Sequence, residues 1–230
     1  MQMNQDLSSS LTQLLSTSQY MKKIEKGTFL FQEDEIANEL YIVLSGKVQI
    51  SKMVPDGREL TIRMCREGDI IGELSLFTPP QRYMLNAKIT ENGQVAVIDK
   101  ENLEELLRVN HQLALDFMKW FNHQYRKSQT KYRDLVLNGK KGALYSTLIR
   151  LSNSYGENCD EGILINIPIT NQELANFCGT SREVVNRMLS ELRKQSIVTI
   201  DKSFITIHDI EYLKIEIDCE NCPLEICNID

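Results

Sequence analysis

No uninterrupted apolar run in the sequence approaches the roughly 18 residues that a membrane-spanning helix requires. The first residues contain no basic group and no apolar core, so they do not have the pattern of a secretory signal peptide. We therefore expect a cytoplasmic protein without a membrane partner. Internal repeats are also missing, and 42% hydrophobic with 25% charged residues are ordinary values for a globular chain of 230 residues. These absences exclude a disordered or fibrous protein.

Groups that would mark an enzyme are missing as well. No serine or cysteine stands in a pattern with an activating base, there is no glycine-rich phosphate loop, and no two carboxylates are paired for acid–base catalysis. His111, His123 and His208 lack the spacing of metal ligands. We predict that the protein is not an enzyme.

The net charge of −6 is concentrated at the C-terminal end. Between His208 and Asp230, seven acidic residues accompany one base, Lys214, so the chain before His208 carries no net charge. The acidic total therefore does not exclude DNA binding, which depends on a local patch.

Short β-type runs separated by turn signals occupy residues 28–99. Tyr41–Leu44 and Val95–Ile98 are examples of the runs, and Pro55–Gly57 is an example of the turns. This pattern predicts an antiparallel barrel or jelly roll. Residues 1–23 are predicted to form one short helix.

The segment 111–137 contains neither proline nor glycine and places apolar residues at helical spacing. A helix over this segment would be about 40 Å long, and apolar residues on more than one side of it need a second surface. We favour a dimerisation helix over a helix that packs only on its own barrel. Asn138–Gly142 is predicted to break the helix and form a hinge, and residues 163–169 to form a strand.

A helix-turn-helix is predicted in the domain that follows. Thr170–Glu173 and Thr180–Glu183 each fit a capping box, and Gly179 allows a tight turn between the two helices. Strands within 198–207 would form a wing.

The outward face of the second helix has the chemistry of major-groove readout. Arg182 can donate twice to guanine, and Glu183 can accept from cytosine. Both stand at the helix start, which meets base edges in this motif, and a hydroxyl there can hold a phosphate. A charged face in solvent is the alternative, but the two caps and the wing favour DNA. The predicted DNA-binding residues are Thr180, Ser181, Arg182, Glu183, Asn186 and Arg187.

Three of the six cysteines, Cys219, Cys222 and Cys227, form a C-x2-C-x4-C run near the C-terminus. Three thiolates at this spacing can point at one centre, and zinc and an iron–sulfur cluster both fit. A disulfide is a poorer interpretation, because one thiol would be left over in a reducing compartment. The other cysteines are predicted to be structural: Cys65 at a strand end, Cys178 buried beside the turn, and Cys159 exposed in a polar loop.

The order of β-roll, long helix, hinge and winged helix-turn-helix resembles the Crp/Fnr family of bacterial transcription regulators. Gly68–Phe77 is similar to the family's barrel signature and Thr180–Arg187 to its recognition helix. The resemblance implies an α+β fold and a homodimer that activates transcription with RNA polymerase. Because Arg182, Glu183 and Arg187 match base-reading positions, it also implies a TGTGA-like palindromic operator.

The resemblance implies four parts of the chain. They are an N-terminal helix and jelly-roll-like β-roll sensor domain (1–110), a dimerisation helix (111–137), a winged helix-turn-helix domain (138–213) and a cysteine tail (214–230).

Members of this family can hold cyclic AMP in the barrel, through a glutamate and an arginine that would be Glu73 and Arg82 here. However, Tyr83 stands where a serine or threonine is needed, Pro79–Pro80 stiffens the loop, and the loop is one residue short. A buried phosphate would lose a charge-assisted hydrogen bond. We expect no cyclic nucleotide and interpret Glu73 and Arg82 as scaffold residues.

The tail resembles the Bacillus type of Fnr, since no cysteine precedes Cys65 and the ending 219–230 and the segment 139–150 match that type closely. The resemblance implies an oxygen-sensitive 4Fe-4S cluster held by Cys219, Cys222, Cys227 and Asp134. From position alone, Asp134 would instead pair with Lys131 or Arg133 on a solvated helix face.

The sequence thus predicts a homodimeric, DNA-binding regulator of anaerobic gene expression that senses oxygen through this cluster. Two alternatives stay open. One is a small-molecule-responsive Crp-like regulator with a structural zinc tail. The other is an iron–sulfur electron carrier in which the helix-turn-helix only packs.

Overall fold

The computed structural model of the chain describes residues 14–15, 18–79 and 81–229, so most of the predicted N-terminal helix lies outside the described residues. The described chain forms two compact units. The first holds the residues up to 53 and 62–123, and the second holds 54–61 and 124–229.

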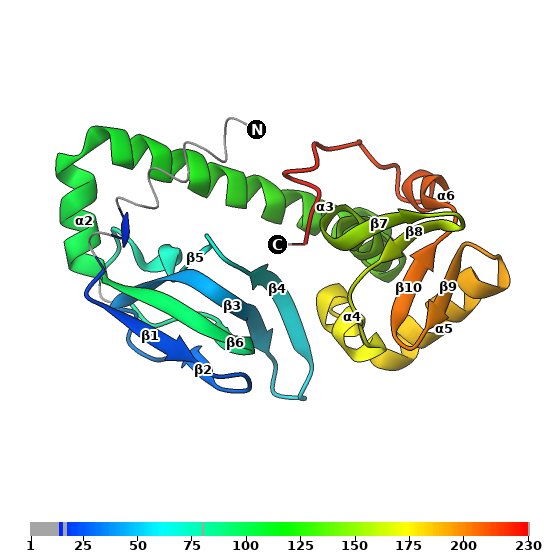
Figure 1. The fold of residues 1–230 in the computed structure, drawn as a ribbon, viewed down its shortest axis with the longest axis horizontal. Helices are drawn as coiled ribbons and strands as arrows, with labels where there is room; N and C mark the ends of the chain where they lie inside the picture. Colours follow the sequence, from blue (N-terminus) through cyan, green and yellow to red (C-terminus); the bar gives the residue numbers. More distant parts are fainter. Residues whose placement is uncertain (1–13, 16–17, 80, 230) are drawn as a thin grey trace. The chain divides into compact units, whose positions relative to one another are not determined.

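The first unit is the predicted β-roll (Figure 1). Its central strands lie in the order β1 (Tyr20–Ile24), β6 (Asn86–Asp99), β3 (Glu39–Met53) and β4 (Glu59–Cys65). The short strands β2 (Phe29–Phe31) and β5 (Ile70–Ile71) pair antiparallel with β6 and β3, and the turn η1 (Glu73–Ser75) follows β5.

Strand β3 shows how the roll acquires two apolar faces. Tyr41 and Val43 pack inside the roll, whereas Leu40 and Ile42 pack with residues of α2 (Lys100–Val109) and of α3 (His111–Tyr155). Successive side chains of a strand point to opposite faces, so one run of apolar residues serves both cores. Leu113 and Trp120 are the buried α3 residues of this second core.

The helix predicted over residues 1–23 is wrong for residues 20–23, which belong to strand β1. It pairs antiparallel with β6, with Tyr20 opposite Val97, and four of its five residues are exposed. Its sequence is mostly polar and therefore carries little strand signal of its own. Its pairing partner, β6, stands far away along the chain, so local sequence does not reveal the pairing.

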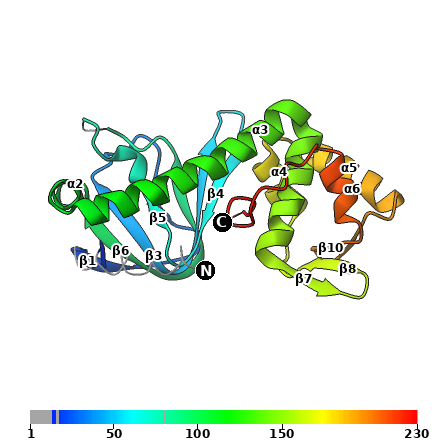
Figure 2. The same cartoon turned by 90° about the horizontal axis from the view of Figure 1, so that it is seen from above.

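Helix α3 begins at the predicted residue, where the Asn110 carboxamide oxygen accepts a hydrogen bond from the Leu113 amide at 3.0 Å. A break is confirmed only at Gly139 (φ 57°, ψ −148°), and the chain is helical on both sides of it. Figure 2 shows that α3 changes direction along its course. A positive φ favours glycine. At Gly142 a Cβ atom would lie 2.7 Å from the Asp134 carbonyl oxygen, so the turn after the kink also requires glycine.

The second unit is a winged helical domain. Its antiparallel sheet has the order β7 (Gly156–Cys159), β8 (Gly162–Ile165), β10 (Phe204–Ile207) and β9 (Val198–Asp201). The remaining helices are α4 (Asn171–Cys178), α5 (Arg182–Lys194) and α6 (Ile210–Ile215).

Two details of this unit differ from prediction. The strand expected over 163–169 ends at Ile165, because its partner β7 begins opposite it at Gly156 and the residue before that belongs to helix α3. Cys159 is exposed as expected, but it belongs to strand β7 rather than to a loop. Cys65 ends β4 and Cys178 is buried, both as predicted.

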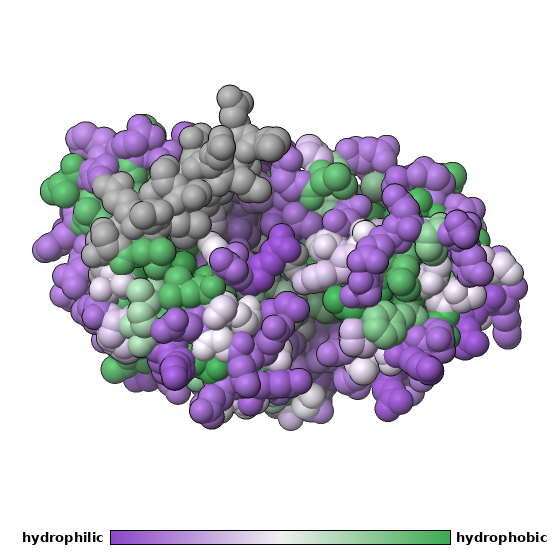
Figure 3. Space-filling view, in the orientation of Figure 1, coloured by the Kyte–Doolittle hydropathy of each residue, from purple (hydrophilic) through white to green (hydrophobic). Residues whose placement is uncertain are grey.

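On the face shown in Figure 3, hydrophilic residues predominate and hydrophobic residues form small separate patches. Within the described part of the chain, no helix is both long enough and apolar enough to cross a membrane.

Candidate DNA-binding surface and candidate cluster site

Helices α4 and α5 form the predicted helix-turn-helix. Thr170 and Glu173 make the expected capping box, with the Thr170 amide donating to the Glu173 carboxylate at 2.7 Å. Gly179 ends α4 in the left-handed region (φ 58°), which lets the chain turn within a few residues. Both helix starts are therefore fixed by local sequence.

The cap of α5 lies one residue later than predicted. Ser181 is the N-cap, and its hydroxyl accepts a hydrogen bond from the Val184 amide at 3.5 Å. Thr180 is 6% exposed, and its hydroxyl has no hydrogen-bond partner among the described residues. Thr180 therefore packs in the turn, so its hydroxyl is not positioned to hold a phosphate as the sequence suggested.

The polar face of α5 is exposed along its length. Arg182, Glu183, Asn186 and Arg187 are all exposed, while Val185 and the later apolar residues are buried. Hydrogen bonds from its own backbone amide and from the Ser181 hydroxyl lower the pKa of Glu183. An ionised Glu183 is an acceptor only, as readout of a cytosine amino group requires.

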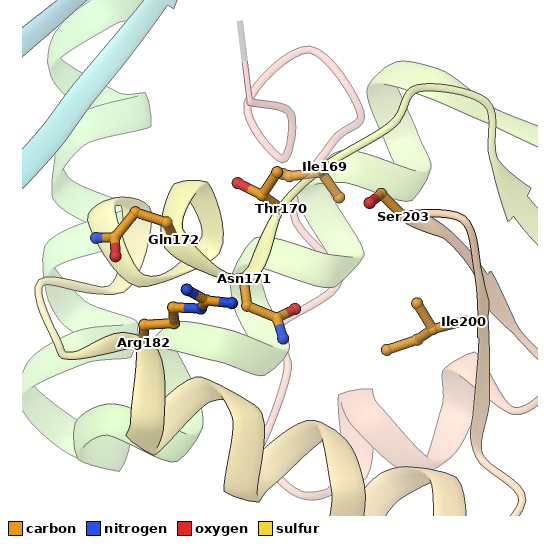
Figure 4. A pocket seen from close by; sticks show the side chains of 7 residues that line it. All are labelled: Ile169, Thr170, Asn171, Gln172, Arg182, Ile200 and Ser203. Atoms are coloured by element: carbon orange, nitrogen blue, oxygen red, sulfur yellow. The ribbon is translucent and has the colours of Figure 1, made fainter.

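A pocket lies between the start of α4, the start of α5 and the wing (Figure 4). Arg182 lines it from α5, Asn171 and Gln172 from the first turn of α4, and Ser203 from the tip of the wing. The side-chain Nδ2 of Asn171 donates to the side-chain Oδ1 of Asn186, which joins the two helices. The unpaired amides of a helix start and an arginine beside them suit a phosphate group. Sequence reasoning missed Asn171, Gln172 and Ser203, although a capped first turn was a signal for the first two.

The cysteine tail follows α6 and turns back at Pro223. The Cys219 amide donates to the Lys214 carbonyl at 2.9 Å, and the Cys227 amide donates to the Pro223 carbonyl at 2.9 Å. Cys222 lies immediately before this turn, and Cys227 lies at its end. All three tail cysteines are free thiols of intermediate burial.

The predicted cluster ligands are electrostatic neighbours. Burial raises the pKa of the Cys227 thiol, Arg150 opposes this shift, and Cys219, Cys222 and Asp134 add to it. Among residues 14–15, 18–79 and 81–229, however, no three His, Cys, Asp or Glu side chains are gathered closely enough to hold a metal ion. The structure thus brings the four groups into one region without arranging them as a ligand set.

Asp134 is not on a solvated helix face. It is 5% exposed, and both carboxylate oxygens are occupied. Oδ1 accepts from Arg133 Nη2 at 2.8 Å, and Oδ2 accepts from the Ser146 hydroxyl at 2.6 Å and lies 3.4 Å from Arg150 Nη2. The expected pairing with Arg133 is present, but the expected solvation is wrong. The kink at Gly139 folds α3 so that Asp134 faces Ser146 and Arg150.

The donor set fits an iron–sulfur cluster chemically. Three thiols and one carboxylate are oxygen- and sulfur-type ligands suited to iron. Arg133 and Arg150 beside Asp134 would offset the negative charge of such a ligand set.

The proposed scaffold residues of the β-roll have partners within the first unit. Glu73 pairs with Arg63 at 3.3 Å, and the Arg82 guanidinium donates to the Asp34 carbonyl. The Tyr83 ring stacks on Phe31 with centroids 3.6 Å apart, and its hydroxyl donates to the Glu39 carbonyl at 2.6 Å.

Comparison with known proteins agrees with this architecture. Residues 21–110 match the cyclic nucleotide-binding domain family, and residues 142–215 match the Crp-like helix-turn-helix domain family. A mutant of CooA from Carboxydothermus hydrogenoformans has a similar fold (TM-score 0.74, 19% identity, 88% of this chain and 89% of that chain). The chain belongs to the Crp/Fnr family, and it is a DNA-binding transcription regulator rather than an enzyme, as the sequence predicted.

Within that family, the "Anaerobic regulatory protein" of Bacillus subtilis (strain 168) is 56% identical over 225 residues, which cover 97% of this chain and 94% of that protein. This similarity supports the predicted Bacillus type of Fnr. The "CRP-like cAMP-activated global transcriptional regulator" of Mycobacterium tuberculosis is 28% identical, over 82% of this chain and 84% of that protein.

Proposed function

We propose that this chain is a cytoplasmic, homodimeric regulator of anaerobic gene expression that senses oxygen through a 4Fe-4S cluster. Cys219, Cys222, Cys227 and Asp134 would hold the cluster, and the cluster, when bound, would supply the oxygen-sensitive chemistry. The observation that carries the proposal is that two arginines in contact with the buried Asp134 also contact the distant cysteine tail. Arg133 pairs with Glu220, beside Cys219, and Arg150 donates to the carbonyl just before Cys227. The relative of Bacillus subtilis, described as an anaerobic regulator, supports the same physiological role.

The tail is placed to act on the kinked helix α3. Before the kink, Arg133 forms an ion pair with Glu220. At and after it, Asn138 donates to the Ile217 carbonyl at 3.3 Å, and Asn153 donates to the Cys227 carbonyl at 2.6 Å. A change in the tail therefore bears on both sides of Gly139. We propose that 138–142 is the hinge of the regulator. It would join the sensor domain (1–110) and the dimerisation helix (111–137) to the DNA-binding domain (138–213). The tail (214–230) would control this hinge.

Metal and sulfide analysis of anaerobically purified protein tests the cofactor. Four iron and four sulfide per chain are expected for one 4Fe-4S cluster. One zinc per chain without sulfide would replace the proposal by the zinc-tail alternative. The electron-carrier alternative does not fit a chain that belongs to a family of transcription regulators.

The exposed side of α3 supports the homodimer. Five large apolar side chains on this side are between 48% and 67% exposed, and successive members are three, four or seven residues apart. They are Leu115, Met118, Tyr125, Tyr132 and Val136. This is the spacing of a coiled-coil seam. A two-fold dimer would cover the seam and present two recognition helices to a palindromic operator.

Met118→Glu is expected to weaken the dimer. Each buried methionine side chain contributes about 1.5–3 kcal/mol, a symmetric interface loses two of them, and the new charges would oppose each other. Sedimentation equilibrium should show dissociation at concentrations where the wild type is dimeric. Met84→Glu changes another exposed methionine, outside α3, and should leave the dimer intact. Equal dissociation of both variants, or of neither, would contradict the seam.

Arg182→Ala and Arg187→Ala should each cost about 1–3 kcal/mol on a TGTGA-like operator and relax base preference. Non-specific binding should change little, because base contacts carry the specificity. Arg193, exposed in the last turn of α5, provides the matched control, and Arg193→Ala should not alter base preference. Titrations on the operator and on base-substituted sites measure both effects. Uniform weakening on all sequences would assign that arginine to phosphate contact.

A further inference from the structure

Arg150 is the most deeply buried charged side chain near the tail. It lies on α3 after the kink and is 2% exposed. Its Nε donates to the Ser146 hydroxyl at 3.1 Å, and its Nη2 donates to the Thr130 hydroxyl at 3.0 Å and lies 3.4 Å from Asp134 Oδ2. Its Nη1 donates to the Ile226 carbonyl at 3.0 Å. One guanidinium thus joins both sides of the Gly139 kink to the tail.

Stability alone does not account for this arrangement. Removing a guanidinium from water is costly, and a buried ion pair is often no more stable than apolar residues of the same volume. The groups that Arg150 contacts also lie at or beside the proposed cluster ligands. Arg150 holds the carboxylate of Asp134, a proposed ligand, and the carbonyl of Ile226, the residue immediately before the proposed ligand Cys227.

The carboxylate of Asp134 has no free acceptor position in this arrangement. Arg133 occupies Oδ1 through Nε at 3.1 Å and Nη2 at 2.8 Å, while Ser146 and Arg150 approach Oδ2. An ionised carboxylate offers about four acceptor positions. A bond to iron must therefore displace one partner, and the contact with Arg150 is the longest of the four. Arg150 would keep its bonds to Thr130, Ser146 and Ile226 after releasing Asp134.

We propose that Arg150 is the positioning residue of the cluster site: it holds Asp134 and the Cys227 segment together in the cluster-free chain and yields Asp134 Oδ2 when iron binds. This inference rests on the proposed function. It predicts that the tail is ordered by Arg150 before any cluster is present. Groups that orient metal ligands typically change metal affinity by about 10–100-fold when they are removed.

Arg150→Lys tests the inference, because lysine keeps the charge but cannot donate to all four partners at once. In the cluster-free variant, hydrogen exchange of the backbone amides of residues 217–229 should become faster, as followed by mass spectrometry. After anaerobic reconstitution, the variant should retain iron and sulfide about 10–100-fold less well than the wild type in competition with a chelator. Arg63→Lys, which alters a half-buried, ion-paired arginine of the β-roll, should change neither measurement.

The folded state is checked by far-ultraviolet circular dichroism. If Arg150→Lys does not fold, Thr130→Val and Ser146→Ala remove single partners of the same network and should shift both measurements in the same direction. Wild-type exchange and wild-type cluster retention in the folded variants would overturn the inference. Cys222→Ser separates the two proposals. If it loses the cluster while Arg150→Lys does not, only the inference fails. If it retains the full cluster, the proposed function fails and the inference falls with it.

Discussion

Exposure of the anaerobically purified protein to air is expected to lower its affinity for the palindromic operator by roughly 10³-fold or more, the lower end of the usual ratio between specific and non-specific DNA binding. Two recognition helices must stand about 34 Å apart to enter successive major grooves on one face of the DNA. The tail contacts α3 on both sides of Gly139 through Glu220 and Cys227. Loss of the cluster would remove the bonds between the tail cysteines and Asp134. Only the ion pairs and hydrogen bonds of the cluster-free chain would then hold the kink, and we expect them to be too weak to fix the helix spacing.

Electrophoretic or fluorescence titrations under anaerobic and aerobic conditions measure this change. A chain in which Cys219, Cys222 and Cys227 are all serine should bind weakly from the start and should not respond to air. Equal affinity of the anaerobic, air-treated and cluster-free proteins for one operator would refute the switch.

Asp134→Ala is expected to remove the cluster and to destabilise the protein. The change deletes the proposed fourth ligand and leaves Arg150 buried without its counter-charge, for which the cost is about 3–5 kcal/mol of unfolding free energy. Asp134→Asn reduces the second effect. The amide loses the charge but keeps the shape of the side chain, and its single oxygen can still accept from the partners of one carboxylate oxygen. A neutral amide is a poor ligand for iron, so Asp134→Asn should fold and still lose most of its iron.

Iron content, the visible spectrum and thermal unfolding of the reconstituted variants provide the measurements. Cys159 is exposed in β7, and Cys159→Ser should behave like the wild type in all three. An Asp134→Asn protein with full iron, an unchanged spectrum and unchanged operator binding would return the search to another fourth ligand. Cys178 would then be less suitable than Cys159, because burial raises its pKa to about 12.

Local signals were sufficient to predict most of the architecture. The starts of α3 and α4 follow from the side-chain caps Asn110 and Thr170, which act within three residues. The roll follows from β-type runs and turn residues. At α5 the sequence predicted a cap at Thr180, one residue too early, because Thr180 and Ser181 are both residues that cap helices well. The burial of Thr180 in the turn decides between them, and burial depends on the packed domain.

The surroundings of Asp134 could not be predicted from spacing. Helical periodicity relates a residue to neighbours three or four positions away. Ser146 and Arg150 reach Asp134 only because α3 bends at Gly139. A glycine in the sequence does not reveal the direction that the helix takes after such a bend. For the same reason, the sequence suggested a solvated carboxylate where the structure has a buried carboxylate with three partner residues.

The path of the tail is held mainly by its main chain and by its isoleucines. Asn138, Arg150 and Asn153 donate to tail carbonyl oxygens, and the side chains of Ile217, Ile226 and Ile229 are buried. The cysteine thiols themselves are only half-buried. Point mutations could therefore remove or restore the ligands while the tail keeps its course. In a lineage that adapts to constant aeration or constant anoxia, sensing could be lost and regained by drift at these few codons without rebuilding the domain around them.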